Sequence, residues 1–158
     1  MKLWTARLVV VMSFASTSLL GISAEASDSV ALIRYGTSYG KCIGYCSKSI
    51  EVFPARVAFI AIAYNQTKRL PAISNEAKLD KQEHEELRRL LKEASVNGLE
   101  ERIGCPDCTD GGAEWIEIPQ HGRFKRITFE KGKPPTQLRA LTNWLGTLQG
   151  RFPVPSVR

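Results

Sequence analysis

Residues 104–118 carry the sequence Gly-Cys-Pro-Asp-Cys-Thr-Asp-Gly-Gly-Ala-Glu-Trp-Ile-Glu-Ile, in which a short double-cysteine loop leads directly into an aromatic strand. Pro106 and Asp107 suit the two central positions of a type I turn, which brings the flanking Cys105 and Cys108 within about 7 Å by Cα. Two cysteines at that separation can form a disulfide or share one metal ion. The stretch therefore predicts a loop fixed by its cysteines at the entrance to a strand.

The strand that follows the loop continues into the clearest hairpin of the chain. Residues 113–118 and 123–130 are rich in β-branched and aromatic side chains, and His121-Gly122 suits a two-residue turn between them. Counting outward from this turn sets Ile116 opposite Ile127. One face of the hairpin should meet the core. Its apolar members are Ile116, Ile118, Ile127 and Phe129.

The remaining elements predict the class of the fold. Strands are expected over residues 29–35, 47–53 and 55–64, the last apolar enough to be covered on both sides. Residues 68–79 look like a polar connector with room for a short edge strand, and residues 99–103 like a short turn or helix. A capping box of Asp80 and Glu83 should start a helix that stops at Asn97-Gly98.

A second amphipathic helix is expected from about Pro135 or Thr136 to Gly150, with its leucines on one face. The predicted order is β-β-β-α-β-β-α. Helices gathered on one face of such a sheet are the natural packing. The sequence thus predicts an α+β fold with a mostly antiparallel sheet of about five strands and two helices on one face.

The N-terminus has the features of an export signal. Residues 1–26 combine Lys2 and Arg7 with an apolar run and end in an Ala-Glu-Ala cleavage pattern, so a signal peptide is predicted there. Residues 27–158 have the length of a single domain and contain no later stretch of membrane-spanning length. We therefore expect a periplasmic or secreted protein. Asn65 begins an Asn-Gln-Thr glycosylation sequon, which matters only in a eukaryotic host.

The charge of the chain is positive, with a formal net charge of +6. The excess lies toward the C-terminus and predicts a candidate basic surface, which would attract an anionic envelope polymer or an acidic protein. Export makes nucleic acid an improbable partner, and an ordinary solvated basic face is the simpler explanation. The residues of this surface are Arg123, Lys125, Arg126, Lys131 and Lys133.

The four cysteines, Cys42, Cys46, Cys105 and Cys108, allow three kinds of chemistry. An even number in an exported chain favours structural disulfides. Four thiolates would also suffice for a structural zinc site, although 58 residues separate the two pairs, which is far from zinc-ribbon spacing. Thiol redox chemistry is disfavoured, because a strand follows Cys108 and nearby aspartates would raise the thiol pKa. Cross-pairing would stabilise by about 4 kcal/mol in the chain-entropy model, but the spacing alone does not choose between it and local pairing.

Three acids near the cysteine loop form a candidate polar site: Asp107, Asp110 and Glu114. Glu114 lies on the core-facing row of the hairpin and could act with either aspartate as a hydrolase pair, which needs carboxyl groups about 5–9.5 Å apart. The acids lack the pattern of a calcium loop. Turn-forming aspartates and a solvated glutamate are the simpler interpretation.

Two motifs resemble a family of small exported bacterial domains of unknown function. Cys42-Ile-Gly-Tyr-Cys46 after a first strand resembles their C-x-G-x-C motif, and residues 105–117 resemble a signature of related uncharacterised proteins. A proline usually follows the second cysteine of the first motif, where this chain has Ser47. The resemblance implies no activity. It does imply local pairing of Cys42 with Cys46.

Together these features predict a non-enzymatic, exported domain, stapled by two disulfides, that binds an envelope component or a partner protein without a cofactor. The alternative is a structural zinc or thiol-redox protein built on the four cysteines. A third hypothesis is a small hydrolase that uses Glu114 with Asp107 or Asp110.

Overall fold

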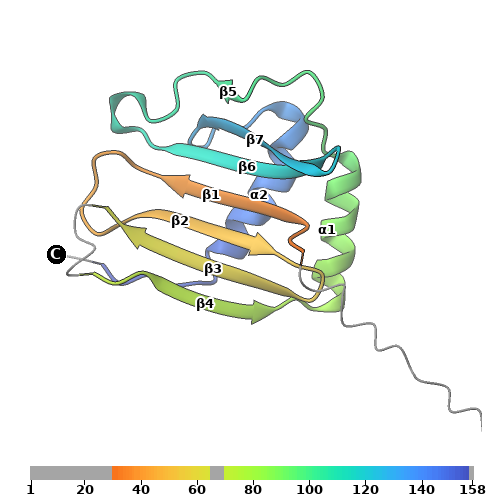
Figure 1. Ribbon diagram of the computed structural model, residues 1–158, viewed down its shortest axis with the longest axis horizontal. Helices are drawn as coiled ribbons and strands as arrows, with labels where there is room; N and C mark the ends of the chain where they lie inside the picture. The colour runs from red at the N-terminus through yellow and green to blue at the C-terminus, as the bar shows by residue number, and fades with distance from the viewer. Residues whose placement is uncertain (1–29, 65–69, 157–158) are drawn as a thin grey trace, which may run out of the picture.

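The computed structural model describes residues 30–64 and 70–156 (Figure 1). The predicted signal peptide, residues 1–26, and the sequon at Asn65 lie outside the described residues. Within the described ranges, none of the helices has the length and apolar character needed to cross a membrane.

The fold is α+β, as predicted, and is built on one seven-stranded sheet in the order β4-β3-β2-β1-β6-β7-β5. All neighbouring strands are antiparallel except β5 and β7, which are parallel. The strands are β1 (Ile33–Ser38), β2 (Tyr45–Val52), β3 (Arg56–Ala63), β4 (Ile73–Lys78), β5 (Arg102–Ile103), β6 (Ala113–Gln120) and β7 (Arg123–Glu130).

The prediction of about five strands was too low by two. β4 is an edge strand whose side chains are all at least partly exposed, so it has no buried stripe to distinguish it from a polar connector. Residues 99–103 were predicted as a short turn or helix. Their last two residues instead form β5, which pairs with β7. The backbone N–H of Thr128 also donates to the carbonyl of Glu101 at 2.8 Å, which extends this contact by one residue.

The β6–β7 hairpin has the predicted register, with Ile116 opposite Ile127. His121 and Gly122 both have positive φ, at 50° and 79°, as a two-residue type I′ turn requires. Ile116 and Ile127 are fully buried. The row predicted to face the core therefore does so, although Ile118 at its outer end is only partly buried.

Helix α1 (Lys81–Glu93) begins at the predicted capping box. The backbone N–H of Glu83 donates to the Asp80 carboxylate at 2.8 Å, and the backbone N–H of Asp80 donates to the Glu83 carboxylate at 2.9 Å. The helix ends earlier than the predicted Asn97-Gly98, because the chain becomes extended at Ala94. This early exit lets Val96 pack into the core, where it is 5% exposed.

Helix α2 (Arg139–Gln149) follows a single 3₁₀ turn and lies behind the centre of the sheet (Figure 1). Its leucines join those of α1 in one core on one face of the sheet. Beyond the helix, the ring of Phe152 stacks on Phe59 of β3 at 4.9 Å between centroids. The opposite face of β3 is more open than predicted, since Ile60 there is 38% exposed.

Candidate functional site

Both cysteine pairs are disulfides between near neighbours in the sequence. Cys42 and Cys46 lie 5.6 Å apart by Cα, Cys105 and Cys108 lie 5.4 Å apart, and no described cysteine is free. Cys46 is buried, whereas the other three are exposed. Residues 30–64 and 70–156 contain no cluster of three or more histidine, cysteine or acidic side chains that could hold a metal ion.

The Cys105–Cys108 loop is a turn of a different type from the one predicted. The backbone N–H of Cys108 donates to the carbonyl of Cys105 at 3.1 Å, as in either turn type. Asp107, however, has φ 63° and ψ 12°, and a positive φ at this position defines a type II turn. Aspartate tolerates this left-handed conformation better than most residues, because its short polar side chain can bond locally.

The two disulfide loops meet at one end of the sheet, although about 60 residues separate them in sequence. Lys41 Nζ lies 3.3 Å from a carboxylate oxygen of Asp110. A Cβ added at Gly112 would lie 2.6 Å from the ring of Tyr39, so this close approach requires glycine. Gly112 thus lets one loop pack against the other.

The three candidate acids do not form one site. Glu114 is turned toward the helices and is only 7% exposed, so the expectation of a solvated glutamate was wrong. Asp110 is paired with Lys41. Asp107 lies beside a hollow on the opposite face of the sheet, which Trp115 also lines.

Glu114 is held by two hydrogen bonds. The phenol of Tyr35 donates to one carboxylate oxygen at 2.7 Å, and the backbone N–H of Gly132 donates to the other at 2.9 Å. Burial, and after it the hydrogen bond to Glu114, raises the pKa of Tyr35 well above its usual range. Tyr35 is therefore a protonated donor, and both oxygens of Glu114 are engaged.

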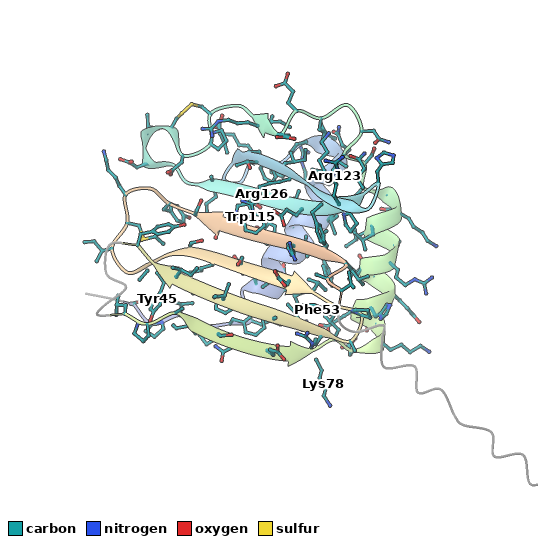
Figure 2. The ribbon with its side chains drawn as sticks, in the orientation of Figure 1. Tyr45, Phe53, Lys78, Trp115, Arg123 and Arg126 are labelled. Carbon is teal, nitrogen blue, oxygen red and sulfur yellow. A yellow bond between two sulfur atoms is a disulfide. The ribbon has the colours of Figure 1, made fainter. Side chains whose placement is uncertain are left out.

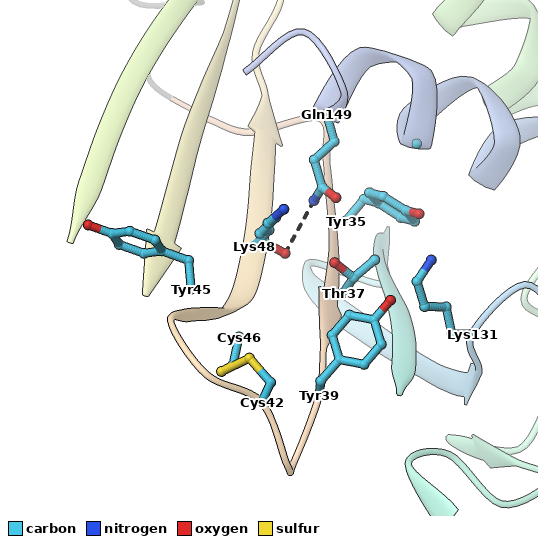
Figure 3. Close-up of a pocket in the computed structure, with 10 residues that line it drawn as sticks. Tyr35, Thr37, Tyr39, Cys42, Tyr45, Cys46, Lys48, Lys131 and Gln149 are labelled. Atoms are coloured by element: carbon cyan, nitrogen blue, oxygen red, sulfur yellow. Dashed lines mark hydrogen bonds between the residues drawn. A yellow bond between two sulfur atoms is a disulfide. The ribbon is translucent and has the colours of Figure 1, made fainter. Parts of the chain in front are cut away.

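A cavity of about 520 Å³ opens beside Tyr35, on the helix side of the sheet (Figure 3). The Cys42–Cys46 disulfide forms one wall, and the C-terminal end of α2 forms another, where the amide of Gln149 donates to the carbonyl of Lys48 at 3.2 Å. The polar side chains that line it come from β1, β2, the turn after β7, α2 and the loop after β1. They are Tyr35, Thr37, Tyr39, Tyr45, Lys48, Lys131 and Gln149.

Two lysines and no carboxylate are among the residues that line the cavity. Neither Lys48 nor Lys131 forms an ion pair with any carboxylate of the described residues. Glu114, which accepts hydrogen bonds from the Tyr35 phenol and the backbone N–H of Gly132, is not among the residues that line the cavity. The charged side chains of the lining are therefore both cationic.

The five residues predicted as one basic surface are distributed over both faces of the sheet. Alternation along β7 puts Lys125 on the helix side, where its ammonium donates to the carbonyls of Val96 at 3.2 Å and Leu99 at 2.9 Å. Lys125 thus holds the segment after α1 in place. Lys133 pairs with Glu130 at 2.5 Å.

Arg126 projects from the opposite face, where its guanidinium lies 4.1 Å from the ring centroid of Trp115 and pairs with Glu117 at 2.8 Å (Figure 2). The other side of the Trp115 indole packs on Gly36, where an added Cβ would lie 2.6 Å from Cε2. Arg123 lies exposed at the tip of the hairpin.

Of the predicted basic set, only Lys131 lines the cavity. The sequence did not single out Lys48, Tyr39 or Gln149. Only the register that sets Lys48 opposite Thr37 and Ala61 shows that this lysine belongs to the row facing the helices.

No protein-family model matches the chain, and no curated protein matches it significantly in sequence.

Proposed function

We propose that this protein is an exported binding domain that takes an anionic component of the cell envelope in the cavity beside Tyr35. The observation that carries the proposal is the pair of lysines, Lys48 and Lys131, which share a tyrosine-lined cavity without a carboxylate partner in the described chain. Ligand sites of proteins are typically concave, with volumes of about 300–1,000 Å³ and a few convergent polar groups. At about 520 Å³ the cavity falls within this range.

Electrostatics favour an anion over a neutral ligand. Two ammonium groups that line one cavity repel each other, and an anion between them relieves this repulsion. Hydrogen bonds to charged groups are also stronger than neutral ones. The hydroxyls of Thr37 and Tyr39 and the amide of Gln149 can bond the uncharged polar groups of the same ligand.

The walls of the cavity favour binding without rearrangement. The Cys42–Cys46 disulfide restrains the loop that forms one side, and Gln149 ties the end of α2 to β2. A site that is already shaped loses less conformational entropy when it binds. Stable disulfides also suit an oxidising compartment such as the periplasm, in agreement with the predicted signal peptide.

Binding is favoured over hydrolysis because the buried acid Glu114 is not paired with a second carboxylate. Both oxygens of Glu114 accept hydrogen bonds, and the aspartates that were its candidate partners lie elsewhere. A general acid or base has to reach its substrate directly or through one water. The arrangement around Glu114 suits a structural tie better than a catalytic pair.

The proposal is tested by a nuclear magnetic resonance titration with three probes: inorganic phosphate, glucuronate and neutral glucose. We expect phosphate and glucuronate to shift the backbone amides of Thr37, Lys48 and Lys131, and glucose to leave them unchanged. The double variant K48M/K131M should weaken anion binding at least tenfold, since each charged contact contributes about 1.5–3 kcal/mol.

The matched control is K92M, which removes an exposed lysine from α1, away from the cavity. It should bind both anions like the wild type. Equal anion affinity of the wild type and of K48M/K131M would contradict the proposal.

A further inference from the structure

The loop between Cys42 and Cys46 presents an apolar side chain to solvent. Ile43 is 75% exposed, more than any other large apolar side chain that the structure describes. Disulfide-bonded cysteines enclose the loop at Cys42 and Cys46, so the chain cannot easily turn Ile43 inward. A single exposed isoleucine needs no explanation by itself, but its neighbours give this one a context.

Those neighbours are aromatic and cationic. Cys42, directly before Ile43, lines the cavity together with Tyr39 and Tyr45, whose rings are apolar and whose hydroxyls are polar. Lys48 and Lys131 line the same cavity (Figure 3). An exposed aliphatic side chain therefore adjoins a cavity with an aromatic and cationic lining.

Lys41, one residue before the disulfide, is 83% exposed and lies 3.3 Å from a carboxylate oxygen of Asp110. This ion pair contributes no net charge at the tip. The positive charge that a membrane could meet here is therefore that of Lys48 and Lys131, which line the cavity.

This combination of side chains suits one monolayer of a membrane. Acyl chains accept aliphatic side chains, the interface accepts tyrosine, and phosphate headgroups accept lysine. Resting on the anion site proposed above, we infer that this end of the protein docks on an anionic phospholipid surface. Ile43 enters the boundary of the acyl chains, and a lipid phosphate occupies the cavity between Lys48 and Lys131.

The docking is expected to be weak and reversible, because one aliphatic side chain does not anchor a protein alone. Stable attachment to a membrane generally needs two signals, such as an apolar group together with a basic patch. Each lysine near an anionic surface strengthens binding by about fivefold. The apolar tip and the cationic cavity are the two signals here.

The test is co-sedimentation of the processed, exported protein with vesicles of phosphatidylglycerol and phosphatidylcholine, and with vesicles of phosphatidylcholine alone. We expect binding only to the anionic vesicles. I43S should lower the partition coefficient about tenfold, as expected for loss of one buried aliphatic side chain. The matched control is I60S, because Ile60 is the exposed isoleucine on the open face of the sheet.

A soluble probe, sn-glycerol 3-phosphate, separates failure of this inference from failure of the anion site. The inference is supported if wild type and I43S bind this probe equally, and if I43S and K48M/K131M lose vesicle binding while the control I60S keeps it. Binding of the probe without a preference for anionic vesicles would overturn the membrane inference and leave the anion site standing. Vesicle binding by I43S equal to that of the wild type would also overturn it. Failure to bind either probe or vesicles would overturn both.

Discussion

The phenol of Tyr35 donates a 2.7 Å hydrogen bond to the carboxylate of Glu114, although the two residues are 79 positions apart. Because Gly132 donates to the other oxygen of the same carboxylate, Glu114 joins β1 to the turn that follows β7. Buried carboxylates are costly unless such bonds replace their hydration. The pair is therefore a structural tie within the core, next to the cavity that we assign to the ligand.

Replacing Tyr35 by phenylalanine should destabilise the fold. Y35F leaves one oxygen of the buried Glu114 without its donor, and loss of a partner to a buried charged group costs about 1–3 kcal/mol. The measurement is urea unfolding followed by circular dichroism. Y64F is the control, because Tyr64 is 45% exposed. Equal stability of Y35F and the wild type would mean that the bond to Glu114 contributes nothing.

Tyr35 should ionise only at a higher pH than an ordinary tyrosine does. Because the pKa of Tyr35 is raised in the folded protein, folding favours the neutral phenol. The resulting contribution to the free energy of unfolding is fully present below about pH 10 and is lost as the pH rises above that value. In an absorbance titration of the four tyrosines, one should stay protonated until the protein unfolds. Y35F should lack this late phase. Complete ionisation of all four phenols in the folded protein would contradict the burial of Tyr35.

Gly36 should tolerate no side chain, because the indole of Trp115 lies on it. In G36A the new methyl group would lie 2.6 Å from Cε2 of Trp115 and 2.9 Å from the carbonyl of Lys48. Overpacking of this kind costs about 1–3 kcal/mol. Urea unfolding measures the loss, and G111A is the control, since its Cβ would meet only Cys108 O at 3.4 Å. A G36A variant as stable as G111A would show that the indole moves aside freely.

Substitutions of Lys125 and Lys131 should have opposite effects: one should lower stability and the other should weaken phosphate binding. K125M leaves the carbonyls of Val96 and Leu99 without their shared donor, so we expect a loss of about 1–3 kcal/mol in stability and unchanged phosphate affinity. K131M should show the opposite pattern, with weaker phosphate binding and wild-type stability. Unfolding and titration of both variants check this. Loss of binding in K125M at full stability would place the ligand outside the assigned cavity.

The disulfide connectivity can be mapped by digestion with trypsin. Cleavage after Lys41 and Lys48 leaves Cys42 and Cys46 in one peptide, so reduction should add the mass of two hydrogen atoms without releasing a second peptide. The peptide with Cys105 and Cys108 should behave in the same way. Cross-linked peptides would contradict the local pairing. Alkylation of four thiols in the unreduced protein, together with bound zinc, would support the zinc alternative.

Local signals in the sequence were sufficient for much of the fold. The capping box at Asp80 and the turn at His121-Gly122 act over a few residues, and both are found as predicted. β4 was missed as a definite strand because its identity depends on pairing with β3 instead of on burial of its own side chains. The two-residue strand β5 likewise exists only through its contact with β7.

The candidate site was harder to predict, because the cavity is lined by β1, β2 and the loop between them, the turn after β7, and α2. Lys131 belonged to the predicted basic set, but Lys48 looks like any strand lysine until its neighbours across β1 and β3 are known. Conversely, the acids Asp107, Asp110 and Glu114 are close in sequence, yet alternation and the turn send them in different directions. Proximity along the chain is a weak guide wherever a loop enters a strand.

The strand order also has a consequence for how the chain assembles. Strands β1 to β4 are consecutive neighbours, whereas the second half of the sheet joins the first along one seam, between β1 and β6. Strands that are close in sequence pair faster than strands that are far apart in sequence. The first four strands should therefore associate before the β6–β7 hairpin pairs with β1. Until then one side of β1 remains an open edge that can pair with a foreign strand. The period of greatest aggregation risk during folding therefore ends when residues 113–118 pair with β1.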